Sequence, residues 1–352
     1  MTGTTTYNQP WIRSKVYDTL FILLPPFLAL LMVALLPERF KTTNAMPLIW
    51  WCILILFVDV AHVYSTLYIT YFHKARLRRH NRLFLLVPVA CYVVGVMLHL
   101  AGGLVFWRAL AYVAVFHFIR QQYGFMRLYT RLSDKRNAGA AIDTIAIYAA
   151  TLYPIIYWHL SPGRNFNWFV ANDFLPAHAD WLKAAAGVLY LTIIAAYIVK
   201  EGWYFIKGQP LNLPKNGLIA GTFISWYFGI VYFNGDLAFT MLNVVSHGIP
   251  YIALVWWGYA GRNAAAAPTR KTLPAYWYGL GVFLLSLFLL AYVEEGLWDG
   301  FIWKEHPAVF QLFNSLPTVD NAVLLALIVP LLSLPQSTHY VLDGFIWRKR
   351  YK

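Results

Sequence analysis

Long apolar stretches, each of about 20 residues, recur along the whole chain and limit its fold more than any other feature. A bilayer core about 30 Å thick is crossed by roughly 20 apolar residues in a helix, which satisfies its own backbone hydrogen bonds inside lipid. Only 12% of the residues are charged, against about 25% in an ordinary soluble domain. The sequence therefore predicts an all-α, polytopic integral membrane helical bundle.

Ten segments are long and apolar enough to be candidate spans. They cover residues 18–36, 47–71, 83–105, 107–128, 141–160, 182–205, 217–234, 238–259, 275–293 and 321–344. Little more than Phe106-Trp107-Arg108 separates spans three and four, and the turn-like Asn234-Gly235-Asp236 joins spans seven and eight. Pro330 and Pro335 can break span ten, and Pro250 can break span eight.

Positive charges test this count, because cytoplasmic loops of membrane proteins are enriched in Lys and Arg. With ten spans, all the basic clusters fall on one side: the five Lys/Arg of HKARLRRHNR (73–82), then Arg127, Arg131, Lys135 and Arg136, then Lys200, Lys207 and Lys215, then Arg262, Arg270 and Lys271, and finally Arg348, Lys349, Arg350 and Lys352. We therefore expect both termini in the cytoplasm and residues 1–352 to form a single transmembrane domain. The expected location is the bacterial inner (cytoplasmic) membrane, as a multi-pass protein.

Two other features exclude common classes of protein. The net charge of +13 comes from short clusters between apolar stretches, with no continuous basic domain, so we expect no nucleic-acid partner. Cys52 and Cys91 both fall inside apolar stretches, which excludes a disulfide framework and a CxxC metal or redox site.

Four spans carry a histidine within the membrane, where an ionisable group is costly unless it is paired or solvated. Spans two, four, eight and ten run from outside to inside and hold these imidazoles at similar depth: His62, His117, His247 and His339. Each has a polar side chain three or four residues away, and the pairs are Asp59 with His62, Gln121 with His117, Asn243 with His247, and Asp343 with His339. Metal-binding histidines usually show such a partner for their second ring nitrogen. We predict a shared metal site whose ligands are His62, His117, His247, His339, Asp59 and Asp343.

Nitrogen and carboxylate ligands without thiolate suit non-haem iron or zinc. Four histidines and two aspartates exceed the three protein ligands of one catalytic zinc, so the surplus favours two ions, which we expect to be iron, with zinc as the alternative. The candidate catalytic groups are Asp59, Asp343 and Gln121.

Other polar residues near the cytoplasmic mouth of the predicted site are candidates for binding substrate: Arg120, Arg127, His73 and Asn243. Together with the basic rim they suit an anionic lipid headgroup. We expect the partners to be a membrane lipid or another hydrophobic small molecule as substrate, and an electron-donor protein.

The motifs DVAH (59–62), HFIRQQ (117–122), SHG (246–248) and HYVLD (339–343) resemble the ligand pattern of histidine-rich integral-membrane non-haem metal oxygenases. This broad group includes membrane desaturases, hydroxylases and carotenoid-cleaving enzymes. The resemblance covers ligand types and the multi-span setting, and the HxxxH and HxxHH boxes of the desaturase–hydroxylase group are absent. It implies a metal-dependent oxidoreductase of lipid metabolism that hydroxylates, desaturates or cleaves a hydrophobic substrate.

Four other interpretations fit parts of the pattern. A zinc-dependent membrane hydrolase, similar in outline to the ceramidase-like proteins, would hold zinc with three histidines and activate water with Asp59 or Asp343. A haem bound by two facing histidines leaves both aspartates unexplained. A proton-coupled transporter would use the same groups as a relay. In a structural protein, single histidines would only bridge helices, and Asp59 would pair with Arg120.

The ten-span topology predicts that positions 80 and 300 lie on opposite sides of the membrane. Reporter fusions after these two residues, one active only in the cytoplasm and one only outside, measure this directly. We expect cytoplasmic signal after residue 80 and outside signal after residue 300, and the same side for both would refute the count.

Overall fold

The computed structural model describes residues 8–133, 138–260 and 273–347, and these residues form helices, turns and loops without a strand. The chain divides into two compact units: residues 1–46, 118–166 and 175–250 make up the first, and residues 47–117, 167–174 and 251–352 the second. Two long helices contribute residues to both units, α8 (Gly103–Tyr129) and α12 (Asp236–Ala260). The expected all-helical class is confirmed for the described residues.

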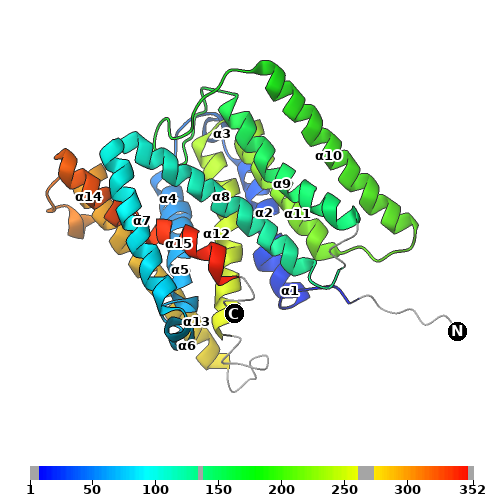
Figure 1. The fold of residues 1–352 in the computed structure, drawn as a ribbon, viewed down its shortest axis with the longest axis horizontal. Helices are drawn as coiled ribbons and strands as arrows, with labels where there is room; N and C mark the ends of the chain where they lie inside the picture. Colours follow the sequence, from blue (N-terminus) through cyan, green and yellow to red (C-terminus); the bar gives the residue numbers. More distant parts are fainter. Residues whose placement is uncertain (1–7, 134–137, 261–272, 348–352) are drawn as a thin grey trace. The chain divides into compact units, whose positions relative to one another are not determined.

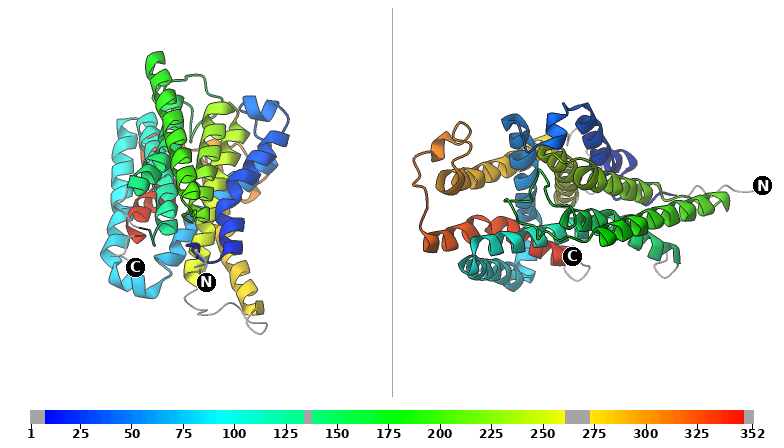
Figure 2. Two further views of the ribbon diagram at one scale, coloured as in Figure 1. Left: turned by 90° about the vertical axis from the view of Figure 1, so that its right-hand side faces the viewer. Right: turned by 90° about the horizontal axis from the view of Figure 1, so that it is seen from above.

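In the first unit, long helices pack in succession, with α10 on α9, α9 on α11 and α11 on α2 (Figures 1 and 2). Besides its parts of α8 and α12, this unit contains α1 (Lys15–Asp18), the π-helical turn η1 (Thr19–Leu23), α2 (Pro25–Leu35), α3 (Arg39–Thr42), α9 (Ala138–His159), α10 (Asp180–Ile206), α11 (Leu213–Trp226) and the π-helical η3 (Tyr227–Tyr232). Pro25 starts α2, where a missing backbone N–H leaves no helical hydrogen bond unmade.

In the second unit, α7 packs on α14 and α15, while α13 packs on α5 (Figure 1). The elements of this unit are α4 (Leu48–Trp51), the π-helical η2 (Cys52–Val60), α5 (Ala61–Ile69), α6 (Lys74–Arg79), α7 (Asn81–Ala101), α13 (Leu273–Trp298), the π-helical η4 (Asp299–Trp303), the 3₁₀ turn η5 (Gln311–Phe313), α14 (Ala322–Leu332) and α15 (Leu334–Ile346). Its core contains Phe283 and Leu287 of α13 with Leu342 of α15, all fully buried. This packing holds α15 against α5, the pair that positions the site described below.

Seven helical stretches in the described residues are long and apolar enough to cross a membrane, or nine if each of two bent helix pairs counts as one span. All ten expected segments are largely helical, but 217–234, which forms α11 and η3, is not among these nine. Lys215 and Asn216 in the first turn of α11 lower its hydropathy. The helices therefore support a multi-pass membrane protein, while the count of ten and the side of the termini stay predictions.

Four of the expected basic clusters need comment. Residues 135–136, 262–271 and 348–352 lie outside the described residues. Lys200 and Lys215, expected in the loop after span six, lie instead inside α10 and α11, where both side chains are buried. The interpretation of these two lysines as solvated loop charges is therefore wrong.

Helix breaks differ from the expected positions at two of three places. The break between spans three and four lies at Gly102, whose φ of +149° favours glycine, so α8 already contains Phe106-Trp107-Arg108. Helix α12 continues through Pro250 without a break. The expected break in span ten is confirmed, because α14 ends before Ser333 and α15 begins with Pro335 in its first turn, at a bend of 46°.

Gly235 offers a test of the turn that precedes α12. A Cβ atom at this position would lie 2.4 Å from the backbone carbon of Lys41. The neighbouring residues also fix the turn, since the N–H of Asn234 donates to the carbonyl of Lys41. We expect Gly235→Ala to destabilise the protein by roughly 2–3 kcal/mol, because backbone atoms cannot yield as a side chain can.

The matched control is Gly124→Ala in α8, where an added Cβ meets no atom within 4 Å. This change should be neutral or stabilise by up to about 1 kcal/mol, because alanine favours the helix. Thermal unfolding in detergent compares the two variants, and equal midpoints would contradict the described turn.

Candidate metal centre

Three of the four predicted histidine ligands lie together in the second unit. His62 comes from α5, His117 from α8 and His339 from α15, and no more than 2% of any of them is exposed. One ring nitrogen from each lies within 4.8 Å of those of the other two. The histidines, which are 55 and 222 residues apart along the chain, thus form one buried cluster that could hold a metal ion.

The rings of His117 and His339 approach each other through the same ring atom. Their Nε2 atoms are 3.2 Å apart, and their ring centroids are 4.5 Å apart at an angle of 65°. His62 lies beside His339 with ring centroids 5.1 Å apart. The Nε2 atoms of His117 and His339 therefore face each other, and a ring nitrogen of His62 lies near this pair.

Each outer nitrogen of the cluster faces a polar side chain. The Nδ1 atom of His339 lies 2.7 Å from Thr66 Oγ1, and that of His117 lies 3.5 Å from Asp343 Oδ2. The Nδ1 atom of His62 lies 3.6 Å from Asp59 Oδ1. Both predicted aspartates thus sit behind an imidazole ring, where a carboxylate orients the ring and makes its inner nitrogen a better ligand.

One hydrogen-bond chain has a fixed direction because it ends on a carboxylate. The Tyr251 hydroxyl donates to Asp343 Oδ1 at 2.5 Å, and an ionised carboxylate can only accept. Tyr251 has no second proton, so Thr66 must donate across their 3.0 Å contact. Thr66 in turn must accept from Nδ1–H of His339.

Asp343 also lies beside the second ring. Its Oδ2 atom is 3.5 Å from Nδ1 of His117, while the Trp347 indole donates to Oδ1 at 2.9 Å. With its proton on Nδ1, facing this carboxylate, His117 would present a lone pair at Nε2. Nε2 of His339, whose proton lies on Nδ1, presents a lone pair 3.2 Å from Nε2 of His117.

Local features of the sequence place these side chains. Asp59 lies at the end of the π-helical η2, a type of turn that often marks functional sites, and His62 follows in the first turn of α5. The break at Ser333 gives α15 its own direction, with Pro335 allowed in its first turn. The 46° bend lets α15 pack on both α5 and α7 and carry His339 into the cluster.

The expected pairing of each histidine with a polar neighbour on its own helix holds only for Asp59 and His62. The structure places Asp343 beside His117 rather than His339. Gln121 donates to the backbone carbonyl of His247 at 2.9 Å instead of contacting His117. Residues one turn apart share a helix face, but their side chains here are satisfied by neighbouring helices.

The remaining predicted site residues have other partners. His247, in the first unit, is buried, and its ring stacks on that of Phe118 with the ring centroids 3.4 Å apart. Asn243 donates to the Phe239 carbonyl within α12. His73 caps α6 by accepting from the Arg76 N–H.

The two arginines proposed to bind substrate also belong to the first unit. Arg120 is exposed and donates to the Tyr148 hydroxyl at 2.5 Å. An ion pair between Asp59 and Arg120 was one interpretation of the sequence. In the structure, Asp59 lies beside His62 and Arg120 bonds to Tyr148, so each has a partner of its own. Arg127 borders a cavity in the first unit.

The sequence pattern did not single out Thr66, Tyr251 or Trp347. Thr66 lies four residues after His62, the spacing that places two side chains on one helix face. A search of the apolar segments for hydroxyl groups at such spacing, besides ionisable ones, would have found Thr66. Tyr251 and Trp347 have no comparable signal, because tyrosine and tryptophan are common throughout this chain.

Comparison with known proteins identifies no family and no relative for this chain. No protein-family model matches the sequence, and neither curated proteins nor solved structures match it.

Thr66 provides a direct test of the hydrogen-bond chain. Thr66→Val keeps the side-chain shape but leaves the buried Nδ1–H of His339 without its acceptor and removes the hydroxyl that donates to Tyr251. We expect a loss of about 1–3 kcal/mol in unfolding free energy. The control is Thr192→Val, whose hydroxyl bonds to its own helix at an exposed position and should change stability little. Equal unfolding midpoints of the two variants in detergent would exclude the chain.

Proposed function

We propose that His62, His117 and His339 bind one metal ion and that this protein is a metal-dependent membrane enzyme. The observation that carries the proposal is the 3.2 Å approach of the Nε2 atoms of His117 and His339, in a cluster where one ring nitrogen from each of the three histidines lies within 4.8 Å of the others. A cation between the rings would be coordinated by these nitrogens. Three buried imidazoles backed by carboxylate and hydroxyl groups match the usual environment of metal-binding histidines.

One ion fits this donor set better than the two that the ligand count suggests. Asp59 and Asp343 are the groups that would bridge or complete a second ion, yet both lie at the outer nitrogens of His62 and His117. We therefore assign them to orienting the imidazoles and holding their protons. Gln121, whose amide bonds to a backbone carbonyl, is assigned to positioning α12 rather than to proton transfer.

His247 remains the proposed fourth ligand. It lies four residues before Tyr251 on the continuous helix α12, which places both side chains on one face of that helix. The ring of Tyr251 lies beside those of His62, His117 and His339 within the second unit. Helical spacing thus supports His247 at the same centre.

Non-haem iron is the ion we propose, and oxidation of a lipid or other hydrophobic molecule is the proposed reaction. When bound, such an iron would supply activation of O₂. The protein would contribute the nitrogen ligands, exclude water by complete burial, hold a proton at the outer nitrogen of His339 through Thr66, and place the Asp343 carboxylate beside the outer nitrogen of His117. An electron-donor protein is the partner that this chemistry calls for.

Zinc-dependent hydrolysis of a lipid amide or ester is the second candidate, because carboxylate-backed histidines are also typical of zinc sites. That reaction needs a carboxylate facing the metal-bound water. Asp59 and Asp343 lie on the far side of their histidines, which favours the oxidation proposal.

Metal analysis of the purified protein tests the proposal. After anaerobic loading with ferrous iron or zinc and desalting, we expect about one ion per chain in the wild type and a large loss in His339→Ala. Asp343→Asn should bind metal about 10- to 100-fold more weakly, because an amide accepts less strongly from the Tyr251 hydroxyl and the Trp347 indole and lacks the negative charge that faces Nδ1 of His117. His178→Ala, an exposed histidine, is the control and should keep full loading.

The reaction is tested with the same samples. Iron-loaded protein with a reductant and a membrane lipid extract should consume O₂ and yield an oxidised lipid detectable by mass spectrometry, and His339→Ala should do neither. Hydrolysis of lipid amides or esters by the zinc-loaded protein alone would favour the second candidate. Metal content that is equal in the wild type and His339→Ala would overturn both.

A further inference from the structure

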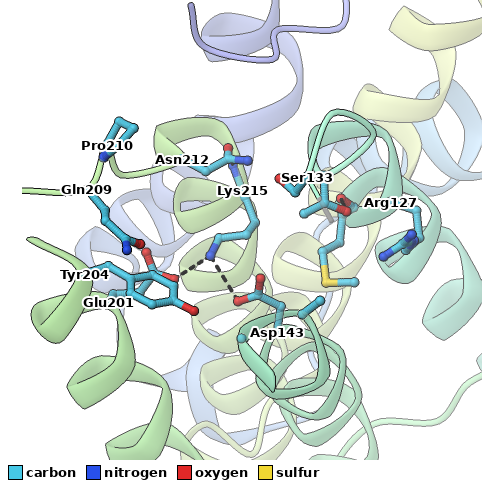
Figure 3. Close-up of a pocket in the computed structure, with 13 residues that line it drawn as sticks. Arg127, Ser133, Asp143, Glu201, Tyr204, Gln209, Pro210, Asn212 and Lys215 are labelled. Atoms are coloured by element: carbon cyan, nitrogen blue, oxygen red, sulfur yellow. Dashed lines mark hydrogen bonds and ion pairs between the residues drawn. The ribbon is translucent and has the colours of Figure 1, made fainter. Parts of the chain in front are cut away.

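Two lysines and two carboxylates form a closed set of ion pairs in the first unit. Lys215 Nζ lies 3.0 Å from Asp143 Oδ1 and 2.5 Å from Glu201 Oε1 (Figure 3). Lys200 Nζ pairs with the same two groups, at 2.6 Å from Glu201. The four charges come from α9, α10 and α11, and their formal charges cancel.

A cavity of about 250 Å³ opens beside these ion pairs. It lies where α8 and α10 end and where α9 and α11 begin, and Asp143, Glu201 and Lys215 line one side of it (Figure 3). Arg127 and Ser133 contribute to another side. At about 30 Å³ per water, the volume equals roughly eight waters, enough for a phosphate group and the atoms that join it.

The charges around the cavity favour an anion. Lys200, which does not line the cavity, and Lys215 together balance Asp143 and Glu201, so Arg127 is the surplus positive charge of this group. Within residues 8–133, 138–260 and 273–347, Arg127 forms no ion pair. Gly139 and Ala140, in the first turn of the 22-residue α9, also line the cavity, and N–H groups at a helix start attract negative charge.

Several hydrogen-bond donors suit a ligand with several acceptor oxygens. Arginine carries five N–H donors in a planar group that matches phosphate. Lys215 has three N–H donors. Its contacts with Asp143 and Glu201 use two of them, which leaves one for a ligand. The hydroxyl groups of Ser133 and Tyr204 add further donors.

The surroundings of the cavity suit a membrane lipid. Near the end of α10, Val199, Trp203, Phe205 and Ile206 are 57–78% exposed. This apolar surface adjoins Tyr204, which lines the cavity, so an acyl chain could lie on α10 with its headgroup in the cavity. On the predicted topology, these helix ends are on the cytoplasmic side.

We propose that this cavity is a binding site for a phosphate-bearing anion, with Arg127 and Lys215 as its main contacts, and that a membrane phospholipid supplies the phosphate. The site uses none of the histidines of the metal centre. The result of a binding test at this cavity is therefore independent of whether the proposed enzymatic function is correct.

Calorimetric titration of the full chain in a maltoside detergent tests the site. The probes are dihexanoylphosphatidic acid, inorganic phosphate, and dihexanoylglycerol as the matched compound without phosphate. We expect saturable binding of the phosphatidic acid and none of dihexanoylglycerol. Arg127→Gln should weaken binding about 10- to 100-fold, as expected for losing a charge-assisted hydrogen bond.

Two further variants make the result specific. Ala140→Phe fills the cavity without changing its charge and should abolish binding. Lys183→Gln removes a cation near the start of α10 that does not line the cavity and should leave binding unchanged. Phosphatidic acid binding alone identifies a lipid site, and equal binding of inorganic phosphate identifies a free-phosphate site. No binding by either probe, or equal affinity in wild type, Arg127→Gln and Ala140→Phe, would overturn the proposal.

Discussion

The proton on a buried imidazole needs an acceptor, and in this protein a chain that ends on Asp343 decides where the proton of His339 lies. Asp343 accepts from Tyr251, Tyr251 accepts from Thr66, and Thr66 accepts from Nδ1–H of His339. The same carboxylate lies 3.5 Å from Nδ1 of His117. Leaving one buried group of this kind unpaired costs about 1–3 kcal/mol. The inward lone pair of His339 follows from that requirement.

Helix geometry brings these groups together from distant parts of the chain. α8 carries His117 without interruption from its start at Gly103, whereas α15 acquires its direction only through the break after α14. Contacts of α15 with α5 and α7, and of α13 with α5, then fix His339 and Thr66 relative to each other. A site held by packed helices rather than loops suits precise coordination, because rigid neighbours keep each ring orientation.

The length of the apolar stretches and the scarcity of charge were enough to predict the helical class, and the cost of ionisable groups in lipid was enough to find His62, His117 and His339. The partners of these residues were harder to predict, because helical spacing shows which groups share a face but not which neighbouring helix supplies the hydrogen bond. Asp343 therefore lies beside His117 and not beside His339 on its own helix.

The burial of two lysines near helix ends was also hard to predict, because their acidic partners lie on neighbouring helices. Lys200 and Lys215 look like loop lysines beside apolar segments, yet Asp143 and Glu201 allow both to be buried. An acid within an apolar stretch, as in AIDTIAIY, was the available signal for this cluster. Its neighbouring cavity gives the protein a second polar region whose chemistry is unrelated to the histidines.

The central claim is that the inward ring nitrogens coordinate one ion. X-ray absorption at the metal edge of loaded, purified protein measures the atoms bound to that ion directly. The account predicts three or four imidazole nitrogens at roughly 2 Å, as in other histidine sites, and the loss of this signal in His339→Ala. An ion surrounded only by water oxygens, or identical spectra for the wild type and the variant, would contradict it.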